Sequence, residues 1–75
     1  MTTTIQYQYT GERIVREKER QTITGLSRPA WYRLERAGLA PRRRPITERT
    51  VGWRLTELQR WVDLTLSGEQ WTGTV

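Results

Sequence analysis

The hydrophobic pattern between residues 24 and 41 predicts a helix with one apolar and one polar half. Ser27 can accept a hydrogen bond from the backbone N–H groups of the turn that follows it, as an N-cap residue does. Pro29 is tolerated in a first helical turn, and Gly38 can leave a helix with a positive φ. We therefore expect the helix to begin after Ser27 and to end at Gly38. With residues placed about 100° apart, the apolar half holds Ala30, Trp31, Leu34 and Ala37, and the polar half holds Arg28, Pro29, Tyr32, Arg33 and Arg36.

A shorter helix is predicted immediately before this one, at Glu17–Thr24. Its acidic residues come early, where the helix dipole favours them, and Gly25 ends it. Its apolar face holds little beyond Ile23, so it must pack against Leu26 and the residues that follow. Two helices joined by a tight glycine turn form a helix-turn-helix, although many helical hairpins of this kind bind no ligand.

The residues upstream of both helices predict short strands. At positions 13–16, Ile14 and Val15 lie between two arginines, and β-branched residues favour a strand. Nearer the N-terminus, Ile5, Tyr7 and Tyr9 alternate with glutamines, which is the period of a half-buried strand. For residues 1–12 a tail that becomes ordered on contact is an equal alternative.

Residues 41–54 change character and predict a charged hairpin. Pro41 and Pro45 exclude a helix, and Ile46 and Val51 flank a polar turn at 47–50. Its cations are Arg42, Arg43, Arg44, Arg49 and Arg54. A charged hairpin directly after a helix-turn-helix is typical of a wing, whose arms straddle the DNA backbone while an arginine reaches a minor groove. The alternative is a solvated loop.

The last helix is predicted at Leu55–Leu66, where Thr56 and Gln59 fit a capping box. Its apolar face holds Leu58, Trp61, Val62 and Thr65. Residues 67–68 end it, and Trp71 in the following segment either folds back onto the core or stays exposed as an interface residue.

In chain order these elements predict an α+β domain, mainly α. It is a small winged helix-turn-helix with three short helices and a two-stranded wing. We place this domain at residues 13–67, with a tail or short strand at 1–12 and a tail at 68–75. A chain of 75 residues offers one small core, near the lower limit for independent folding.

Composition narrows the function. Cysteine and histidine are both absent, which excludes disulfides and thiolate metal sites and removes the commonest general base. The acids form no paired constellation, and the chain has no glycine-rich phosphate loop. We therefore expect no enzyme, no cofactor and no metal. No apolar run approaches the ~20 residues of a membrane span, and the first residues lack the pattern of a signal peptide, so we expect a cytoplasmic protein.

The charge points to a polyanionic partner. The net charge is +5, and residues 28–60 hold nine arginines against three acids. Of the thirteen basic residues twelve are arginine, whose planar fork fits phosphate and guanine edges. Trp53 and Trp61 would allow stacking on single-stranded bases, but their amphipathic surroundings favour burial.

At this point five ordered motifs resemble a known family. They are T-G-L-S-R at 24–28, Y-R at 32–33, G-x-x-P at 38–41, V-G-W at 51–53 and E-L-x-x-W at 57–61. Residues 13–62 are thus similar to the AlpA family of phage and prophage regulators, winged helix-turn-helix proteins related to MerR-type domains and phage excisionases. The chain departs from that pattern at Arg20, where many relatives have Val. It departs again at 29–31, where Pro-Ala-Trp replaces Ser/Thr-Thr-Ile and its hydroxyls.

The predicted helix after Ser27 would supply the DNA contacts. Arg28 and Arg33 are placed to reach base edges, with Arg28 as the first candidate. Ser27, Tyr32 and Arg36 are assigned to phosphates. The hairpin adds Arg42, Arg43, Arg44 and Arg49 to the candidate DNA-binding residues.

Three classes of function remain open. The first is a sequence-specific double-stranded DNA binder that regulates prophage transcription or acts as an excisionase beside a site-specific integrase. The second is a basic RNA-binding module, and the third is a protein-interaction adaptor or inhibitor of a phage or host factor. A single recognition helix suggests that adjacent copies bind cooperatively and bend the DNA, as a homo-oligomer assembled on repeated sites.

Overall fold

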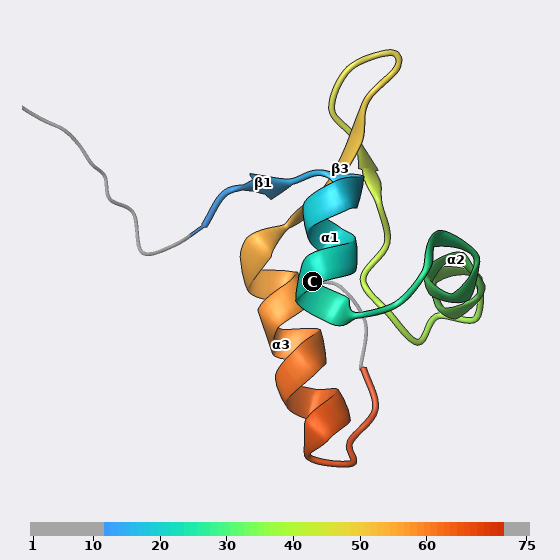
Figure 1. The fold of residues 1–75 in the computed structure, drawn as a ribbon, viewed down its shortest axis with the longest axis vertical. Coiled ribbons are helices and arrows are strands. Elements are labelled where there is room, and N and C mark those ends of the chain that lie inside the picture. The colour runs from blue at the N-terminus through green and yellow to red at the C-terminus, as the bar shows by residue number, and fades with distance from the viewer. Residues whose placement is uncertain (1–11, 72–75) are drawn as a thin grey trace, which may run out of the picture.

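The computed structural model describes residues 12–71. Its elements are β1 (Ile14–Val15), α1 (Glu17–Thr24), α2 (Arg28–Arg36), β2 (Arg44–Pro45), β3 (Val51–Arg54) and α3 (Leu55–Leu66). In Figure 1, α1 lies beside α3, the hairpin of β2 and β3 extends beyond them at the top, and α2 lies crosswise at one side. The alternation predicted at Ile5, Tyr7 and Tyr9 falls outside the described residues.

The predicted fold class is confirmed, with one addition to the wing. Three helices accompany an antiparallel sheet whose strand order is β1-β3-β2, so β1 joins the hairpin as a third strand. Ile14 lies opposite Arg54, and Arg44 lies opposite Gly52. Because β1 precedes α1 and β3 precedes α3, the sheet ties the start of both helices together.

The predicted ends of the first two helices are confirmed. Ser27 Oγ accepts from the Ala30 backbone N–H at 3.4 Å, as expected of the N-cap of α2. Gly25 after α1 and Gly38 after α2 have φ values of 76° and 77°, in the left-handed region that favours glycine. No helix formed by residues 12–71 has the length and apolar character needed to cross a membrane.

The predicted capping box of α3 is wrong. Arg54 occupies the N-cap position without a capping hydrogen bond, and Thr56 lies inside the first turn. The Glu12 carboxylate caps this turn instead, since it accepts from the Thr56 backbone N–H at 3.2 Å and from its hydroxyl at 3.0 Å. Pairing of β1 with β3 brings Glu12 to this helix across 44 residues of sequence.

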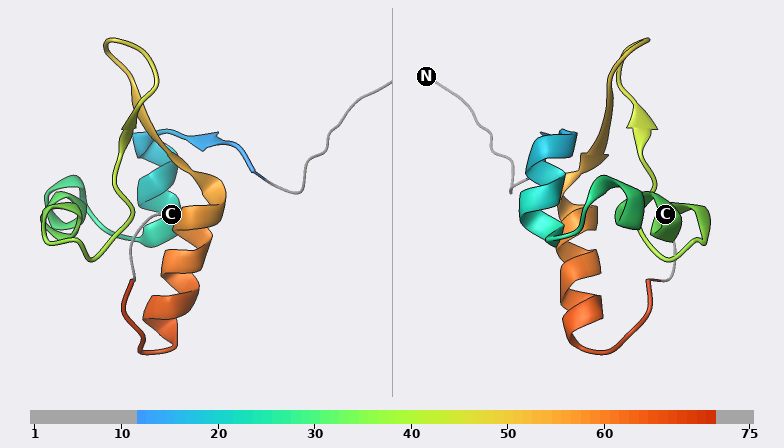
Figure 2. Two further views of the ribbon diagram at one scale, coloured as in Figure 1. Left: turned by 180° about the vertical axis from the view of Figure 1, so that it is seen from behind. Right: turned by 45° about the vertical axis from the view of Figure 1, so that its right-hand side comes forward.

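Tryptophan dominates the core. Within residues 12–71 the buried hydrophobic side chains are Val15, Trp31, Ala40, Trp53, Leu58, Trp61 and Trp71. The rings of Trp31 and Trp61 meet edge to face with their centroids 4.9 Å apart. Figure 2 shows the segment after α3 turning back alongside that helix, and Trp71 is buried, which is the first of the two alternatives left open for it. Thr65, predicted on the apolar face of α3, is exposed.

Arg20 is a buried cation with partners on α1, in the turn before α2 and in the sheet. Its side chain is fully buried, donates to both carboxylate oxygens of Glu17, and donates to the Leu26 carbonyl at 2.6 Å. Its guanidinium carbon lies 5.3 Å from the Trp31 ring centroid and 5.9 Å from that of Trp53. The cation therefore joins α1, the turn before α2 and the sheet where an apolar side chain would only fill space.

Candidate nucleic-acid interface

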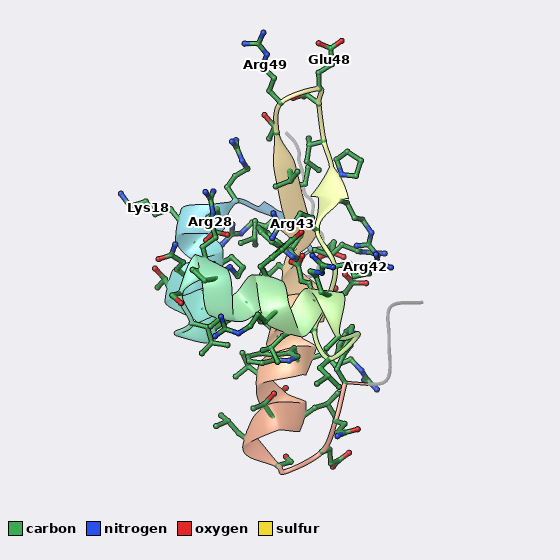
Figure 3. All side chains as sticks on the ribbon, turned by 90° about the vertical axis from the view of Figure 1, so that its right-hand side faces the viewer. Lys18, Arg28, Arg42, Arg43, Glu48 and Arg49 are labelled. Carbon is green, nitrogen blue, oxygen red and sulfur yellow. The ribbon has the colours of Figure 1, made fainter. Side chains whose placement is uncertain are left out.

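The exposed side of α2 and the hairpin share one face of the domain. In Figure 3, Arg28 and Lys18 lie toward one end of α2, Arg42 lies toward the other end, and Arg43 lies between α2 and the hairpin. Arg49 extends from the hairpin tip. The sequence analysis did not include Lys18 among the candidate residues, although it extends toward this face from α1. The only feature of the sequence that could have indicated it is its position within a run of charged residues.

The polar half of α2 is exposed as predicted. Arg28 has 70 % of its side chain exposed, and its Nε lies 4.0 Å from the Glu17 carboxylate, the outer limit of an ion pair. Arg33 and Arg36 are exposed farther along the helix. Tyr32 is 45 % exposed and lies beneath the guanidinium of Arg36.

The buried half of α2 differs from the prediction. Ala37 is exposed, whereas Glu35, which the apolar pattern did not mark, is only 6 % exposed. Trp31 is buried as expected, so the inward direction of the helix is rotated from the alanines toward Glu35. The rotation is possible because both carboxylate oxygens of Glu35 accept hydrogen bonds, and a buried charge needs such partners.

Those partners connect α2 to the hairpin. Glu35 Oε2 accepts from Trp53 Nε1 of β3 at 2.9 Å, and Glu35 Oε1 accepts from Arg43 Nε at 2.9 Å. Arg43 directly precedes β2. One carboxylate thus holds the helix against both arms of the hairpin. The sequence could have indicated this bridging role of Glu35, because Glu35 is an acidic residue within an arginine-rich stretch.

The three consecutive arginines of the hairpin have different environments. Arg42 is exposed, and Arg43 uses its Nε on Glu35. Arg44 donates from both terminal nitrogens to Glu57 of α3, at 2.8 and 3.0 Å. These hydrogen bonds raise the pKa of the Arg44 guanidinium despite its partial burial. The repulsion expected within the triplet is therefore relieved by two carboxylates of the protein itself.

The tip of the hairpin is a polar turn as predicted. The Ile46 backbone N–H donates to the Thr50 carbonyl at 2.7 Å and closes the turn. Arg49 and Glu48 extend from it in Figure 3. Within residues 12–71 neither side chain forms an ion pair, so the two opposite charges stand free at the tip.

Ion pairs elsewhere reduce the charge away from this face. Arg13 pairs with Glu19 and Arg54 pairs with Glu12 on the strand side of the domain. Within the described part of the chain, the cations outside any ion pair are Arg16, Lys18, Arg33, Arg36, Arg42, Arg49 and Arg60. Four of these seven, Arg33, Arg36, Arg42 and Arg49, belong to α2 and to the hairpin with the residues that lead into it.

The acidic side chains of residues 12–71 do not gather into one cluster. Residues 12–71 contain no group of three or more acidic side chains arranged to hold a metal ion. Among these residues, the acids that form ion pairs with arginines are Glu12, Glu17, Glu19, Glu35 and Glu57. The arrangement as a whole can bind an extended anion, with α2 on one side of it and the hairpin on the other.

Comparison with known proteins gives one match. The model of the family described as prophage CP4-57 regulatory protein (AlpA) matches residues 13–66. That range contains all three helices and the whole sheet. No curated protein and no solved structure matches the chain.

Proposed function

The chain belongs to the AlpA family of phage regulatory proteins, and from that membership we propose that it binds double-stranded DNA in a sequence-specific manner. The observation that carries this proposal is the shared face of α2 and the hairpin, fixed by the hydrogen bonds of Glu35. A capped helix with an exposed arginine row suits a major groove, and a charged hairpin beside it suits the neighbouring backbone and minor groove.

The exposed residues take different roles in this proposal. Arg28 and Arg33 read base edges in the major groove, most naturally guanine N7 and O6. Ser27, Tyr32 and Arg36 contact phosphates and position the helix. From the hairpin, Arg42 and Arg43 contact phosphates and Arg49 reaches the minor groove. Arg44 contributes its positive charge while its guanidinium holds the hairpin to α3.

The biological role we propose is control of a prophage in the host cytoplasm. The protein acts either as a transcriptional regulator or as a directionality factor that helps a site-specific integrase to excise the prophage. In both roles neighbouring copies bind adjacent sites, because one domain offers one recognition helix and a modest number of base contacts.

A gel-shift titration tests the proposal. The targets are attachment-site and promoter duplexes of the prophage and a single-stranded RNA of equal length, each at two salt concentrations. Contact with about six phosphates predicts a steep loss of affinity as salt rises. Arg28→Ala should weaken the preferred duplex by ~1–3 kcal/mol and relax discrimination at one base pair. Arg60→Ala, an exposed arginine of α3, is the matched control. Preference for the RNA would overturn the proposal.

One observation favours a second function, that of a protein-interaction adaptor. A largely apolar hollow of about 360 Å³ lies between the C-terminal part of α3 and the end of α2, bordered by Leu34, Trp61 and Trp71. Nearby Leu66 is 82 % exposed. Contact between neighbouring copies or with an integrase through this surface would explain both features.

A binding series separates contact between copies from independent binding. DNA fragments with one site and with several sites are compared for wild type and Leu66→Ser. Cooperative contact predicts tighter binding per site on the longer fragment, reduced by the substitution. Equal affinity per site on both fragments would exclude contact between copies.

A further inference from the structure

We propose that the hollow between α2 and the base of the hairpin is a binding site for one phosphodiester group of the nucleic-acid backbone, with Arg43 as its central ligand. The hollow measures about 310 Å³ and is lined by Tyr32, Glu35, Arg36, Arg42 and Arg43. The inference rests on the proposed function, and it adds a defined site to what would otherwise be a diffuse positive surface.

The charge of the hollow suits an anion. Its lining includes three arginines and one carboxylate, that of Glu35, which is turned into the protein. Glu35 is 6 % exposed, and its Oε1 accepts a hydrogen bond from Arg43 while its Oε2 accepts one from Trp53. Its negative charge therefore positions Arg43 from behind, and the open side of the hollow stays positive.

Arg43 is held ready before any ligand arrives. Its Nε is fixed by Glu35, and its guanidinium carbon lies 5.1 Å from the Tyr32 ring centroid and 5.7 Å from that of Trp53. Among residues 12–71 no hydrogen bond uses its two terminal nitrogens. Two parallel N–H donors in a fixed plane match two oxygens of a phosphate. Because the side chain is already ordered, binding costs little conformational entropy.

A second guanidinium completes the site. Arg36 lies over the same Tyr32 ring, with its guanidinium carbon 5.7 Å from the centroid. Both arginines line the hollow, so an anion bound there would be attracted by two guanidinium groups. Arg42 is exposed at the rim and adds attraction.

Arg44 shows by contrast why Arg43 is the ligand. Both residues belong to the same triplet, but Arg44 has both terminal nitrogens bound to the two oxygens of Glu57. A phosphate would have to displace that carboxylate. Arg43 offers the same two nitrogens free of any partner in the described chain.

The location gives the site a purpose. A phosphate held between α2 and the hairpin belongs to the strand that separates the groove entered by the helix from the groove approached by the hairpin. Fixing one phosphate there sets the register of the helix along the duplex, so that base contacts are made at defined positions.

The first experiment asks whether the hollow binds phosphate at all. The indole N–H of Trp53 shares Glu35 with Arg43 and therefore reports on the site. Uniformly ¹⁵N-labelled full-length protein is titrated with inorganic phosphate, and with sodium chloride at equal ionic strength. A saturable shift of the Trp53 indole resonance is expected with phosphate alone. Arg43→Lys should abolish it, because lysine keeps the charge and loses the fork, whereas Arg60→Lys should not.

The second experiment asks whether that site is used on nucleic acid. Duplex DNA carrying one neutral methylphosphonate at each backbone position in turn is bound to wild type and to Arg43→Lys. At one position neutralisation should cost wild type about 10-fold to 100-fold in affinity and cost Arg43→Lys almost nothing. The same scan is carried out on single-stranded RNA. The polymer in which one neutralised position weakens binding to wild type but not to Arg43→Lys is the one whose phosphate occupies the hollow.

The outcomes are distinct. A Trp53 shift that is equal with chloride, or unchanged in Arg43→Lys, overturns the site. A uniform loss at every methylphosphonate position in both proteins overturns its use on DNA. Failure of the protein to bind any duplex sinks the proposed function, yet the phosphate titration still decides whether the hollow is an anion site. Near-identical thermal unfolding of wild type and Arg43→Lys excludes misfolding as the cause of a lost signal.

Discussion

The indole Nε1 of Trp53 donates a 2.9 Å hydrogen bond to the Glu35 carboxylate, and this bond joins the hairpin to the helix from inside the domain. The same carboxylate accepts from Arg43, so one acidic side chain sets the position of α2 and of the guanidinium beside it. The stability of the domain and the proposed binding of DNA would therefore depend on one shared residue, whose carboxylate is turned into the protein.

Glu35→Gln tests this double role. The amide keeps the shape and one acceptor but loses the charge that holds Arg43, so we expect a loss of about 1–3 kcal/mol in unfolding free energy. Urea unfolding followed by tryptophan fluorescence measures it. Glu48→Gln at the hairpin tip removes the same charge from an exposed site and should leave the midpoint unchanged. Equal midpoints for the two variants would contradict the bridging role.

Arg20 offers a test of the buried cation. Arg20→Met removes the buried partner of Glu17 and leaves the Leu26 carbonyl without its donor, so we expect a loss of about 3–5 kcal/mol, a large part of the stability of a domain of this size. Adding Glu17→Leu should restore part of the stability, since the unpaired carboxylate is then gone as well. Thermal unfolding by circular dichroism compares the two. A double variant no more stable than the single one would show that pairing with Glu17 is not what matters.

Neighbouring Arg42 and Arg44 form a matched pair for DNA binding. Arg42→Gln and Arg44→Gln each remove one positive charge, and the two positions are only two residues apart. Arg42→Gln should weaken all DNA sequences alike and reduce the salt dependence by about one phosphate contact, with no change in stability. Arg44→Gln should lower stability by about 1 kcal/mol through the loss of Glu57 pairing. Gel shifts at several salt concentrations and urea unfolding distinguish them, and the reverse pattern would refute the assignment.

Stability should fall in acid. Burial alone would raise the pKa of the Glu12 carboxyl, but hydrogen bonds from Arg54 and Thr56 hold it below its usual value of 4.5. A carboxyl whose pKa is lowered on folding contributes its full stabilisation at pH values above the pKa that it has in the unfolded chain. That contribution is lost as the pH drops through the lowered value. Unfolding midpoints measured from pH 7 to pH 3 should decline as the pH approaches and passes 4.5, where Glu12 is half protonated in the unfolded chain.

Glu12→Gln provides the control for the acid loss. The variant should start from a lower midpoint at neutral pH and decline less toward acid. Part of the decline should persist, because hydrogen bonding to Arg13 lowers the pKa of Glu19 as well. An unchanged slope would mean that the cap of α3 does not depend on the charge of Glu12.

The sequence predicted what is encoded locally. Helix ends follow from single residues whose backbone or side chain does the capping, as at Ser27, Gly25 and Gly38, and these were correct. The hairpin followed from prolines and a polar turn in the same way. The assignment of individual residues to DNA contact remains a prediction.

What the sequence did not predict depends on partners far along the chain. Glu12 caps a helix that begins more than 40 residues later. Glu35 is buried because Trp53, 18 residues away, donates to it, and no helical wheel contains that residue. Arg20 fits a site between two indole rings that belong to different elements. The hydrophobic pattern cannot predict these contacts, because a prediction based on that pattern assigns every charged side chain to the surface.

The clamp that Glu35 forms on Trp53 and Arg43 has a mechanical consequence. Because this carboxylate joins α2 to the hairpin, these two arms would keep a set spacing on the DNA that we propose as the ligand. The duplex would then have to deform to fit that spacing, and its base steps differ in how easily they deform. A pyrimidine–purine step beneath the gap between the arms would yield most easily, and sequence would be selected there without a single contact to a base.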